Sequence, residues 1–450
     1  MRVLRRAPDA KDSQSSAGHH APGAAGRRAP ARRVRARRPL AAGVAAAVLA
    51  AGAVACAAEP SGSAGPPEGP GLIAVPAVVV TGHAYQVPRP LPAAAPGTLI
   101  AATDLGPDHR FADARRWTVL YHSLDAHGAD VPVSGTVLVP AGPAPSGGRP
   151  VVSWGHGTTG VADMCAPSQS PNLGFDVYAQ QLTALLRAGY AVTASDYPGL
   201  GTPGTHTYLV GADEGNAVVD IVTAARRLVP GLSTTWFAMG HSQGGQAALF
   251  AARAARRAPG LRLAGAVAMA PASHLEEMLP GVAASHVSSD LSFALYSLAG
   301  LAATDPSVRL PALLGPSAYR IAERVLAVCQ QAGYTALDGV STDEELPLTG
   351  EAADRLGAEM GAYGDPDRAA IRQPVLVVQG EDDQDVPVDW TAEVTRRLEA
   401  LGSPAVEERT YPGAGHDEVL AASVCDVLAF LAEHSGRTAA DCAPLRPEAG

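Results

Sequence analysis

Residues 236–246 read Trp-Phe-Ala-Met-Gly-His-Ser-Gln-Gly-Gly-Gln and place Ser242 at the centre of a Gly-x-Ser-x-Gly motif. An apolar run leads into the motif, and an Ala-rich stretch of helical character follows it at once. This succession predicts a buried strand, a sharp turn and a helix, which together raise the serine above the edge of a sheet. Gly240 and Gly244 allow the backbone to turn without a side-chain clash. An ordinary glycine-rich turn is the alternative, so the rest of the chain has to decide.

A serine nucleophile needs an imidazole base and a carboxylate that orients the base. The apolar run at residues 374–379 has the composition of a buried parallel strand, and the loop after it is rich in acids. Asp383 fits the spacing Gly-x-x-Asp-x-x-Val-Pro on both sides, as is usual in α/β-hydrolases, and is the predicted acid. Asp382 and Asp385 are the alternatives.

The predicted base is His416, one of 13 histidines in the chain. It lies on a Pro-Gly-Ala-Gly loop between a predicted strand at residues 406–411 and a predicted helix at residues 419–431. The order serine, aspartate, histidine along the chain is that of the α/β-hydrolases, whereas the chymotrypsin and subtilisin types use other orders.

Acyl transfer also needs backbone N–H groups that bind the oxyanion of the tetrahedral intermediate. One such donor is expected from Gln243, the residue after the nucleophile. The second is expected from the loop Gly-His-Gly-Thr-Thr-Gly at residues 155–160, which follows an early predicted strand. We favour the N–H of Thr158, with Gly157 and Thr159 as alternatives.

Strand and helix patterns alternate along the chain, which predicts the α/β class, with a mostly parallel sheet flanked by helices. Two antiparallel strands are expected first, at residues 117–121 and 131–139. The alternation continues with strands at 151–154, 190–194, 235–239 and 264–268, and helices at 176–188, 213–228 and 243–257.

Residues 271–372, just before the predicted acid-bearing strand, show helical patterns and no clear strand. An insertion at this place would lie above Ser242 as a cap and shape the acyl or alcohol pocket. A moving lid and a packed subdomain without motion are both compatible with the pattern. The predicted cap helices are 274–279, 291–303, 318–332 and 352–360.

Residues 1–55 have the layout of an export signal. The first 38 residues carry eleven basic side chains against two acids, and residues 40–55 are apolar and uncharged. That apolar run is short for a membrane span, which needs about 20 residues. We therefore predict a signal peptide and an exported protein.

The C-terminal end of this predicted signal peptide allows two kinds of processing. Acylation of Cys56 would make the protein a lipoprotein anchored at the outer face of the membrane, whereas ordinary cleavage would secrete it freely. Residues 56–72 are rich in Gly, Pro and Ser and are expected to form a flexible linker. The enzyme domain is then expected over residues 73–450.

Net charge limits the partners. The whole chain carries −10, and the part after residue 55 carries about −19. Such an acidic surface argues against nucleic acid and against docking to anionic lipids through basic patches.

Four cysteines follow Cys56, and an even number in an exported protein favours disulfides. We favour the pairs Cys165–Cys329 and Cys425–Cys442, with free buried thiols as the alternative. No cysteine or histidine spacing fits zinc, so no metal is expected.

Several further stretches resemble the secretory lipase family of the α/β-hydrolase superfamily, over roughly residues 118–431. They are Trp-Gly-His-Gly-Thr-Thr-Gly at 154–160, Cys-Ala-Pro-Ser at 165–168, Gly-Tyr-Ala-Val-Thr-Ala-Ser-Asp-Tyr-Pro-Gly-Leu-Gly at 189–201 and Gly-Thr-His-Thr-Tyr-Leu-Val-Gly at 204–211.

This resemblance implies ester hydrolysis, a helical cap, no cofactor, and a catalytic triad of Ser242, Asp383 and His416. Some relatives carry an acidic oxyanion-loop residue where this chain has Thr158 and Thr159, so the identity of the second donor stays open.

The favoured function is that of an exported serine ester hydrolase, a lipase or carboxylesterase that cleaves small-molecule or lipid esters through an acyl-enzyme. A peptidase or an acyltransferase on the same fold is the alternative, because fold and triad do not separate these activities. A non-catalytic binding lipoprotein is a third and weaker hypothesis. The sequence does not determine acyl-chain length or oligomeric state.

Overall fold

The computed structural model describes residues 85–285, 288–340, 350–440 and 442. The predicted signal peptide, the linker and Cys56 lie outside these residues. Within them, no helix is both long enough and apolar enough to cross a membrane.

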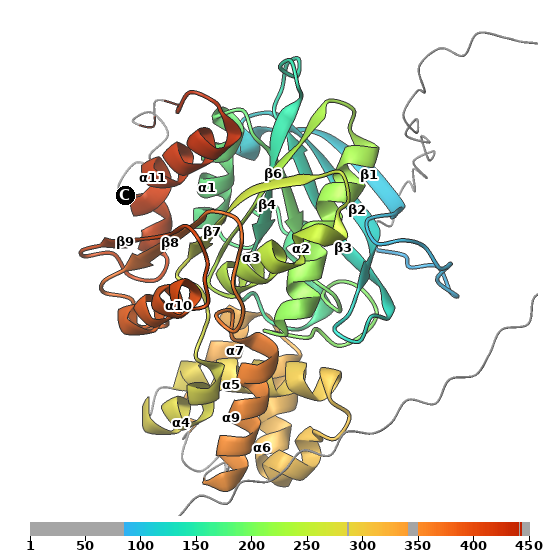
Figure 1. Cartoon of the computed structure of the whole chain (residues 1–450). Coiled ribbons are helices and arrows are strands. Elements are labelled where there is room, and N and C mark those ends of the chain that lie inside the picture. The colour runs from blue at the N-terminus through green and yellow to red at the C-terminus, as the bar shows by residue number, and fades with distance from the viewer. Residues whose placement is uncertain (1–84, 286–287, 341–349, 441, 443–450) are drawn as a thin grey trace, which may run out of the picture. The chain divides into compact units, whose positions relative to one another are not determined.

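The described chain is organised around one mixed, mostly parallel sheet (Figure 1). Its strand order is β1-β2-β3-β5-β4-β6-β7-β8-β9. Neighbours are antiparallel from β1 to β5 and parallel from β5 to β9. The strands are β1 (Leu99–Asp108), β2 (Ala114–Leu124), β3 (Asp130–Val139), β4 (Arg149–Gly155), β5 (Ala191–Ser195), β6 (Leu232–His241), β7 (Arg262–Met269), β8 (Val375–Gly380) and β9 (Val406–Tyr411).

Strand β1 was not among the predicted strands. Its sequence contains Gly106 and Pro107, and its pairing with β2 is interrupted by two register shifts. Such residues are depleted in strands, and an edge strand tolerates them because only one of its sides must pair.

Helices cover both faces of the sheet. They are α1 (Asp176–Arg187), α2 (Gly211–Leu228), α3 (Gln243–Ala254), α10 (Val388–Ala400) and α11 (Glu418–Ser435). Apolar residues of α2, α3 and α10 form one buried cluster with the sheet, and those of α1 and α11 form a second.

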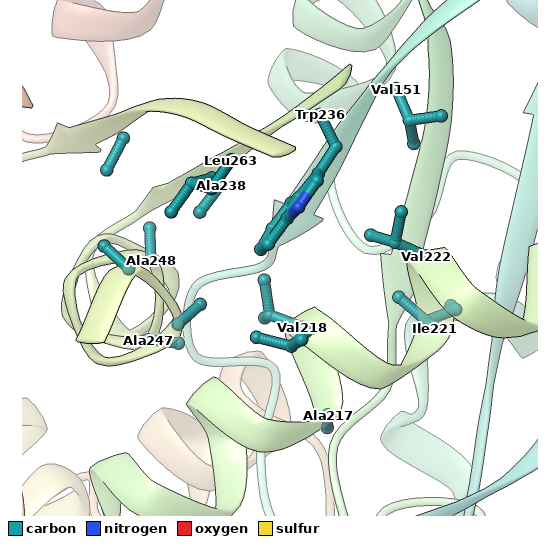
Figure 2. Packing of buried hydrophobic residues seen from close by; sticks show 14 of the residues in the cluster. Val151, Ala217, Val218, Ile221, Val222, Trp236, Ala238, Ala247, Ala248 and Leu263 are labelled. Atoms are coloured by element: carbon teal, nitrogen blue, oxygen red, sulfur yellow. The ribbon is translucent and has the colours of Figure 1, made fainter. Parts of the chain in front are cut away.

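Strand β6 contributes to both clusters, because successive side chains of a strand point to opposite faces. Trp236 and Ala238 belong to the cluster with α2 and α3, whereas Phe237 and Met239 belong to the cluster with α1 and α11. Figure 2 shows Trp236 on the face that carries α2, near Val218. A strand buried on both faces holds the motif that follows it firmly in place.

A group of helices is inserted between β7 and β8 (Figure 1). This is the helical cap of an α/β-hydrolase fold, placed before the strand that leads to Asp383. The cap has its own buried apolar cluster. Its described helices are α4 (Leu275–Ser285), α5 (Ser288–Thr304), α6 (Leu310–Leu326), α7 (Gln330–Ala336) and α9 (Glu351–Gly364).

The predicted helix at residues 318–332 is wrong in its bounds. Helix α6 begins earlier, at Leu310, with a kink at Gly315 (φ 71°, ψ 174°), and α7 begins only at Gln330. The break lies at Cys329, which is tied to another part of the chain by a disulfide and by an isolated bridge to Gly160. This tertiary restraint overrides the local helical preference.

Both favoured disulfides are present. Cys425–Cys442 ties α11 to the C-terminal segment, and Cys165–Cys329 ties the segment after the predicted oxyanion loop to the cap. Two backbone contacts reinforce the second link, namely the bridge between Gly160 and Cys329 and the hydrogen bond of 2.9 Å from Gln330 N to Thr159 O. The cap is therefore fastened next to the predicted oxyanion loop.

Candidate active site

Ser242 lies at the junction of β6 and α3 in a backbone conformation that is unusual for serine. Its φ is 57° and its ψ is −120°. A non-glycine residue in such a conformation costs on the order of 1–3 kcal/mol and persists only where its surroundings hold it. Here Ser242 N donates to Met269 O (2.9 Å), and Ser242 O accepts from Ala272 N (3.1 Å). Ser242 as a whole is only partly buried.

The two glycines of the motif are required by close backbone contacts. A Cβ at Gly244 would lie 1.9 Å from Gly155 O, and one at Gly240 would lie 2.2 Å from Gly244 O. These atoms belong to the ends of neighbouring strands and to the first turn of α3, so they cannot move aside cheaply. The motif spacing therefore follows from the packing of the turn against β4.

Gly244→Ala is expected to destabilise the protein by about 4 kcal/mol, because the added Cβ would clash with backbone atoms in a packed interior. Urea unfolding followed by circular dichroism measures the loss. Gly281→Ala is the matched control, because Gly281 lies in α4 with open space around it, and alanine favours a helix by up to about 1 kcal/mol over glycine. Equal stability of both variants would contradict the packing argument.

The structure brings Asp383 and His416 together. Asp383 follows β8, its side chain has 0% exposure, and its Oδ2 accepts a hydrogen bond of 2.8 Å from His416 Nδ1. Its Oδ1 accepts from the N–H groups of Asp385 (2.9 Å) and Val386 (2.8 Å). The alternatives Asp382 and Asp385 are exposed.

The charges of this pair support each other. Burial acts to raise the pKa of Asp383, but the hydrogen bond and charge of His416, with the N–H of Val386, outweigh it and lower that pKa. Burial likewise acts to lower the pKa of His416, but the hydrogen bond and charge of Asp383 outweigh it and raise that pKa above 6.5. The hydrogen bond between Asp383 and His416 thus stabilises the charged form of each partner.

Ser242 is not hydrogen-bonded to His416 within the described residues. The two segments are joined instead through His241, whose Nε2 donates to His416 O at 2.9 Å. The rings of His241 and His416 lie 4.5 Å apart between centroids. Catalytic hydrogen bonds are often absent or long before a substrate binds.

The loop after β4 presents the predicted oxyanion donors. Gly157 N donates to Tyr178 Oη at 3.1 Å, so its N–H is already engaged. Within residues 85–285 and the other described segments, the N–H groups of Thr158, Thr159 and Gln243 have no acceptor. The Thr158 side chain is held by a hydrogen bond of 2.6 Å between its Oγ1 and Tyr208 Oη.

Glu214, in the first turn of α2, contacts the candidate site in a way that the sequence did not predict. Glu214 is fully buried, and its Oε1 accepts from Gln243 Nε2 (2.7 Å) and from Leu209 N (2.9 Å). Burial raises its pKa to about 8, against the hydrogen bonds from Gln243 and Leu209, which lower it. Asp213 and Glu214 are both buried, and two adjacent acids at the start of a helix give no sequence signal of burial.

The buried carboxyl predicts a pH-dependent stability. The pKa of Glu214 is about 8 in the folded protein against 4.5 as the ordinary value, so the unfolded chain loses this proton first. The contribution of the protonated Glu214 carboxyl to the free energy of unfolding is therefore complete below about pH 4.5. It is lost as the pH rises towards 8. Glu214→Gln keeps an acceptor oxygen and carries no charge.

The unfolding free energy of Glu214→Gln is therefore expected to rise relative to the parent protein between pH 5 and pH 8. Urea unfolding of both proteins at several pH values measures this difference, and taking the difference cancels other titrating groups. A difference that stays constant over this range would contradict a raised pKa at Glu214.

No group of three His, Cys, Asp or Glu side chains in the described part of the chain is arranged to hold a metal ion.

Comparison with known proteins agrees with this geometry. A family model described as secretory lipase matches residues 166–341, and a model described as prolyl oligopeptidase family matches residues 326–438. A search of curated protein sequences finds no significant match.

Solved structures share the fold. Candida antarctica lipase A in its closed state aligns with a TM-score of 0.62 at 20% identity, covering 76% of this chain and 83% of the lipase. The rice cell wall degrading esterase LipA from Xanthomonas oryzae aligns with a TM-score of 0.60 at 20% identity, covering 76% of this chain and 97% of the esterase.

The sheet order, the strained serine turn and the inserted cap are those of the α/β-hydrolase fold, which the similar structures share. Over residues 166–341, which the family model matches, the chain is similar to the secretory lipases.

Proposed function

We propose that this protein is an exported serine ester hydrolase, a lipase or carboxylesterase that acts through an acyl-enzyme. The observation that carries the proposal is the buried carboxylate of Asp383, which is hydrogen-bonded to His416 Nδ1 on a loop joined to the Ser242 turn. The lipase and esterase folds among the similar structures support it.

In the proposed reaction, His416 Nε2 takes the proton of Ser242 Oγ as this oxygen attacks the ester carbonyl carbon. The N–H groups of Gln243 and Thr158 stabilise the resulting oxyanion, each by about 3–4 kcal/mol. The imidazolium then gives its proton to the departing alcohol, which leaves the acyl group on Ser242. Water, deprotonated by His416, releases the acid and restores the serine.

Because His416 must be neutral to accept a proton, kcat/KM is expected to rise with pH through the pKa of His416. Asp383 raises this pKa above 6.5, so the acid limb should lie above that pH.

A peptidase is the second candidate, favoured by the prolyl oligopeptidase match at residues 326–438. That segment contains Asp383 and His416, the part that serine hydrolases of either specificity share, so the match supports the acid and base more than it supports peptide substrates. An acyltransferase with the same triad is the third candidate.

We further propose that residues 1–55 direct export, with Cys56 as the candidate site of acylation. Two disulfides are consistent with an oxidising compartment. Mass spectrometry of the protein from its native membrane fraction distinguishes the two forms: an acylated N-terminal Cys56 indicates a lipoprotein, and an unmodified N-terminus in the medium indicates secretion.

The function is tested with p-nitrophenyl esters from acetate to palmitate, using protein that lacks residues 1–55. Aminoacyl p-nitroanilides are assayed in parallel, and a fluorophosphonate probe reports which serine reacts. Ester turnover with a phosphonate adduct on Ser242 is expected. Turnover of anilides alone would overturn the ester reading in favour of a peptidase, and an adduct elsewhere would overturn the site.

A further inference from the structure

A chain of buried hydrogen bonds connects the three segments of the candidate site. Gly157 N on the oxyanion loop donates to Tyr178 Oη at 3.1 Å, and Tyr178 Oη lies 3.0 Å from His241 Nδ1. His241 Nε2 then reaches His416 O at 2.9 Å. Tyr178 is 2% exposed and His241 is 1% exposed, so the two hydrogen bonds of the Tyr178 hydroxyl are shielded from water.

The direction of each bond follows from the chemistry of the groups. A carbonyl oxygen only accepts, so the Nε2 of His241 carries the hydrogen. A neutral imidazole has one N–H, so its Nδ1 accepts, and the hydroxyl of Tyr178 must be the donor. The same hydroxyl oxygen accepts from Gly157 N. The chain therefore has one arrangement of its hydrogens as long as His241 is neutral.

His241 is suited to staying neutral. Burial, followed by the charge of His416, lowers its pKa well below 6.5. A neutral ring is what the site requires, because the His241 and His416 rings lie 4.5 Å apart between centroids. A second positive charge there would oppose the imidazolium that His416 forms during catalysis.

Tyr178 is fixed by its own neighbours. Its ring packs edge-on against Trp154 and Phe175, with centroid distances of 5.4 Å and 5.3 Å. Helix α1, which carries Tyr178, belongs to the apolar cluster on the same face as Trp154. The hydroxyl is thus a fixed point from which Gly157, and with it the adjacent Thr158, takes its position.

We propose that Tyr178 and His241 are positioning residues, which hold the oxyanion loop and the base loop at fixed places around Ser242. This inference rests on the proposed function. His241 directly precedes Ser242. Its imidazole ring therefore connects the Ser242 turn with both the oxyanion loop and the base loop. The competing interpretation is that these bonds only satisfy buried polar groups and serve stability alone.

The first test is Tyr178→Phe, which removes one oxygen and leaves the ring. Tyr190→Phe is the matched control, because Tyr190 is also 2% exposed and belongs to the same apolar cluster. Among the described residues, the Tyr190 hydroxyl makes a single long contact of 3.4 Å, to Ser435 Oγ. Both are buried Tyr→Phe changes, and one of them leaves the site untouched.

For Tyr178→Phe, kcat per titrated active site is expected to fall about 10-fold with KM unchanged, because misplaced groups matter mainly in the transition state. The affinity for a boronic acid, which mimics the tetrahedral intermediate, should fall by the same factor. The thermal unfolding midpoint should drop no further than in Tyr190→Phe. An unchanged kcat per active site, or a change in KM alone, would overturn the proposal.

The second test compares two replacements of His241. His241→Gln keeps an N–H at about the reach of Nε2 and is expected to retain more activity than His241→Leu, which has none. Adding Tyr178→Phe to His241→Leu should cost little more, because residues acting through one chain are not additive. If the losses of activity in the two single variants add up fully in the double variant, Tyr178 and His241 do not act through one chain of hydrogen bonds.

The rate at which a fluorophosphonate modifies Ser242 provides a readout that needs no ester substrate. If the parent protein reacts at Ser242 but hydrolyses no ester, the proposed substrate class fails while Tyr178→Phe still tests the positioning role. If the parent protein does not react at Ser242, both proposals fail.

Discussion

Ser242→Ala is expected to lower kcat for ester hydrolysis by about 10⁵–10⁶-fold, because removal of the nucleophile closes the acyl-enzyme route. The proposed oxyanion donors Gln243 and Thr158 are unchanged in this variant, so a residual rate about 10³-fold above the uncatalysed reaction is expected. The variant should fold, since alanine fits the space of serine and only the hydroxyl is lost.

The measurement is steady-state hydrolysis of a p-nitrophenyl ester with freshly purified variant, together with fluorophosphonate labelling. Ser435→Ala is the control, because Ser435 lies at the end of α11 and its hydroxyl bonds to Leu431 O. Two results together would contradict the assignment of the nucleophile. They are retention of more than about 1% of kcat in Ser242→Ala and labelling of the parent protein at a serine other than Ser242.

Asp383→Asn is expected to lower kcat by about 10⁴-fold. The carboxylate accepts from His416 Nδ1, which leaves Nε2 free to take the serine proton. An asparagine can turn its amide nitrogen towards Nδ1, which favours the tautomer with the hydrogen on Nε2 and blocks the base. Asparagine also carries no charge to stabilise the imidazolium.

Asp382→Asn is the matched control for this variant. Asp382 is the preceding residue of the same loop and is exposed, so its replacement is expected to change kcat less than about threefold. Comparison of kcat, KM and the unfolding midpoint for the two variants separates chemistry from folding. A larger loss in Asp382→Asn than in Asp383→Asn would move the acid to the neighbouring position.

Local sequence patterns were sufficient for much of this site. The Gly-x-Ser-x-Gly spacing predicted a strand, a turn and a helix, and β6, Ser242 and α3 occupy those places. The spacing around Asp383 selected one acid among four in its loop, and that acid is the one hydrogen-bonded to His416. These patterns are readable because each depends on a few consecutive residues next to a buried strand.

Strand β1 and the break between α6 and α7 could not be predicted from local sequence patterns. The edge strand β1 carries glycine and proline that its single pairing partner tolerates, so its local pattern does not indicate a strand. The break between α6 and α7 occurs where Cys329 is bound to a segment 164 residues away. Helical periodicity runs through this point, and only the distant restraint ends the helix.

The sequence by itself determined the class of fold and the candidate nucleophile, acid and base, since each is encoded in short spacings and in the apolar runs of buried strands. Only the tertiary structure decided that Glu214 accepts a hydrogen bond from Gln243, and that Tyr178 and His241 link the loop at residues 155–160 to the loop that carries His416. The physical reason is that burial and hydrogen-bond partners depend on contacts between segments far apart in the chain, which local periodicity does not record.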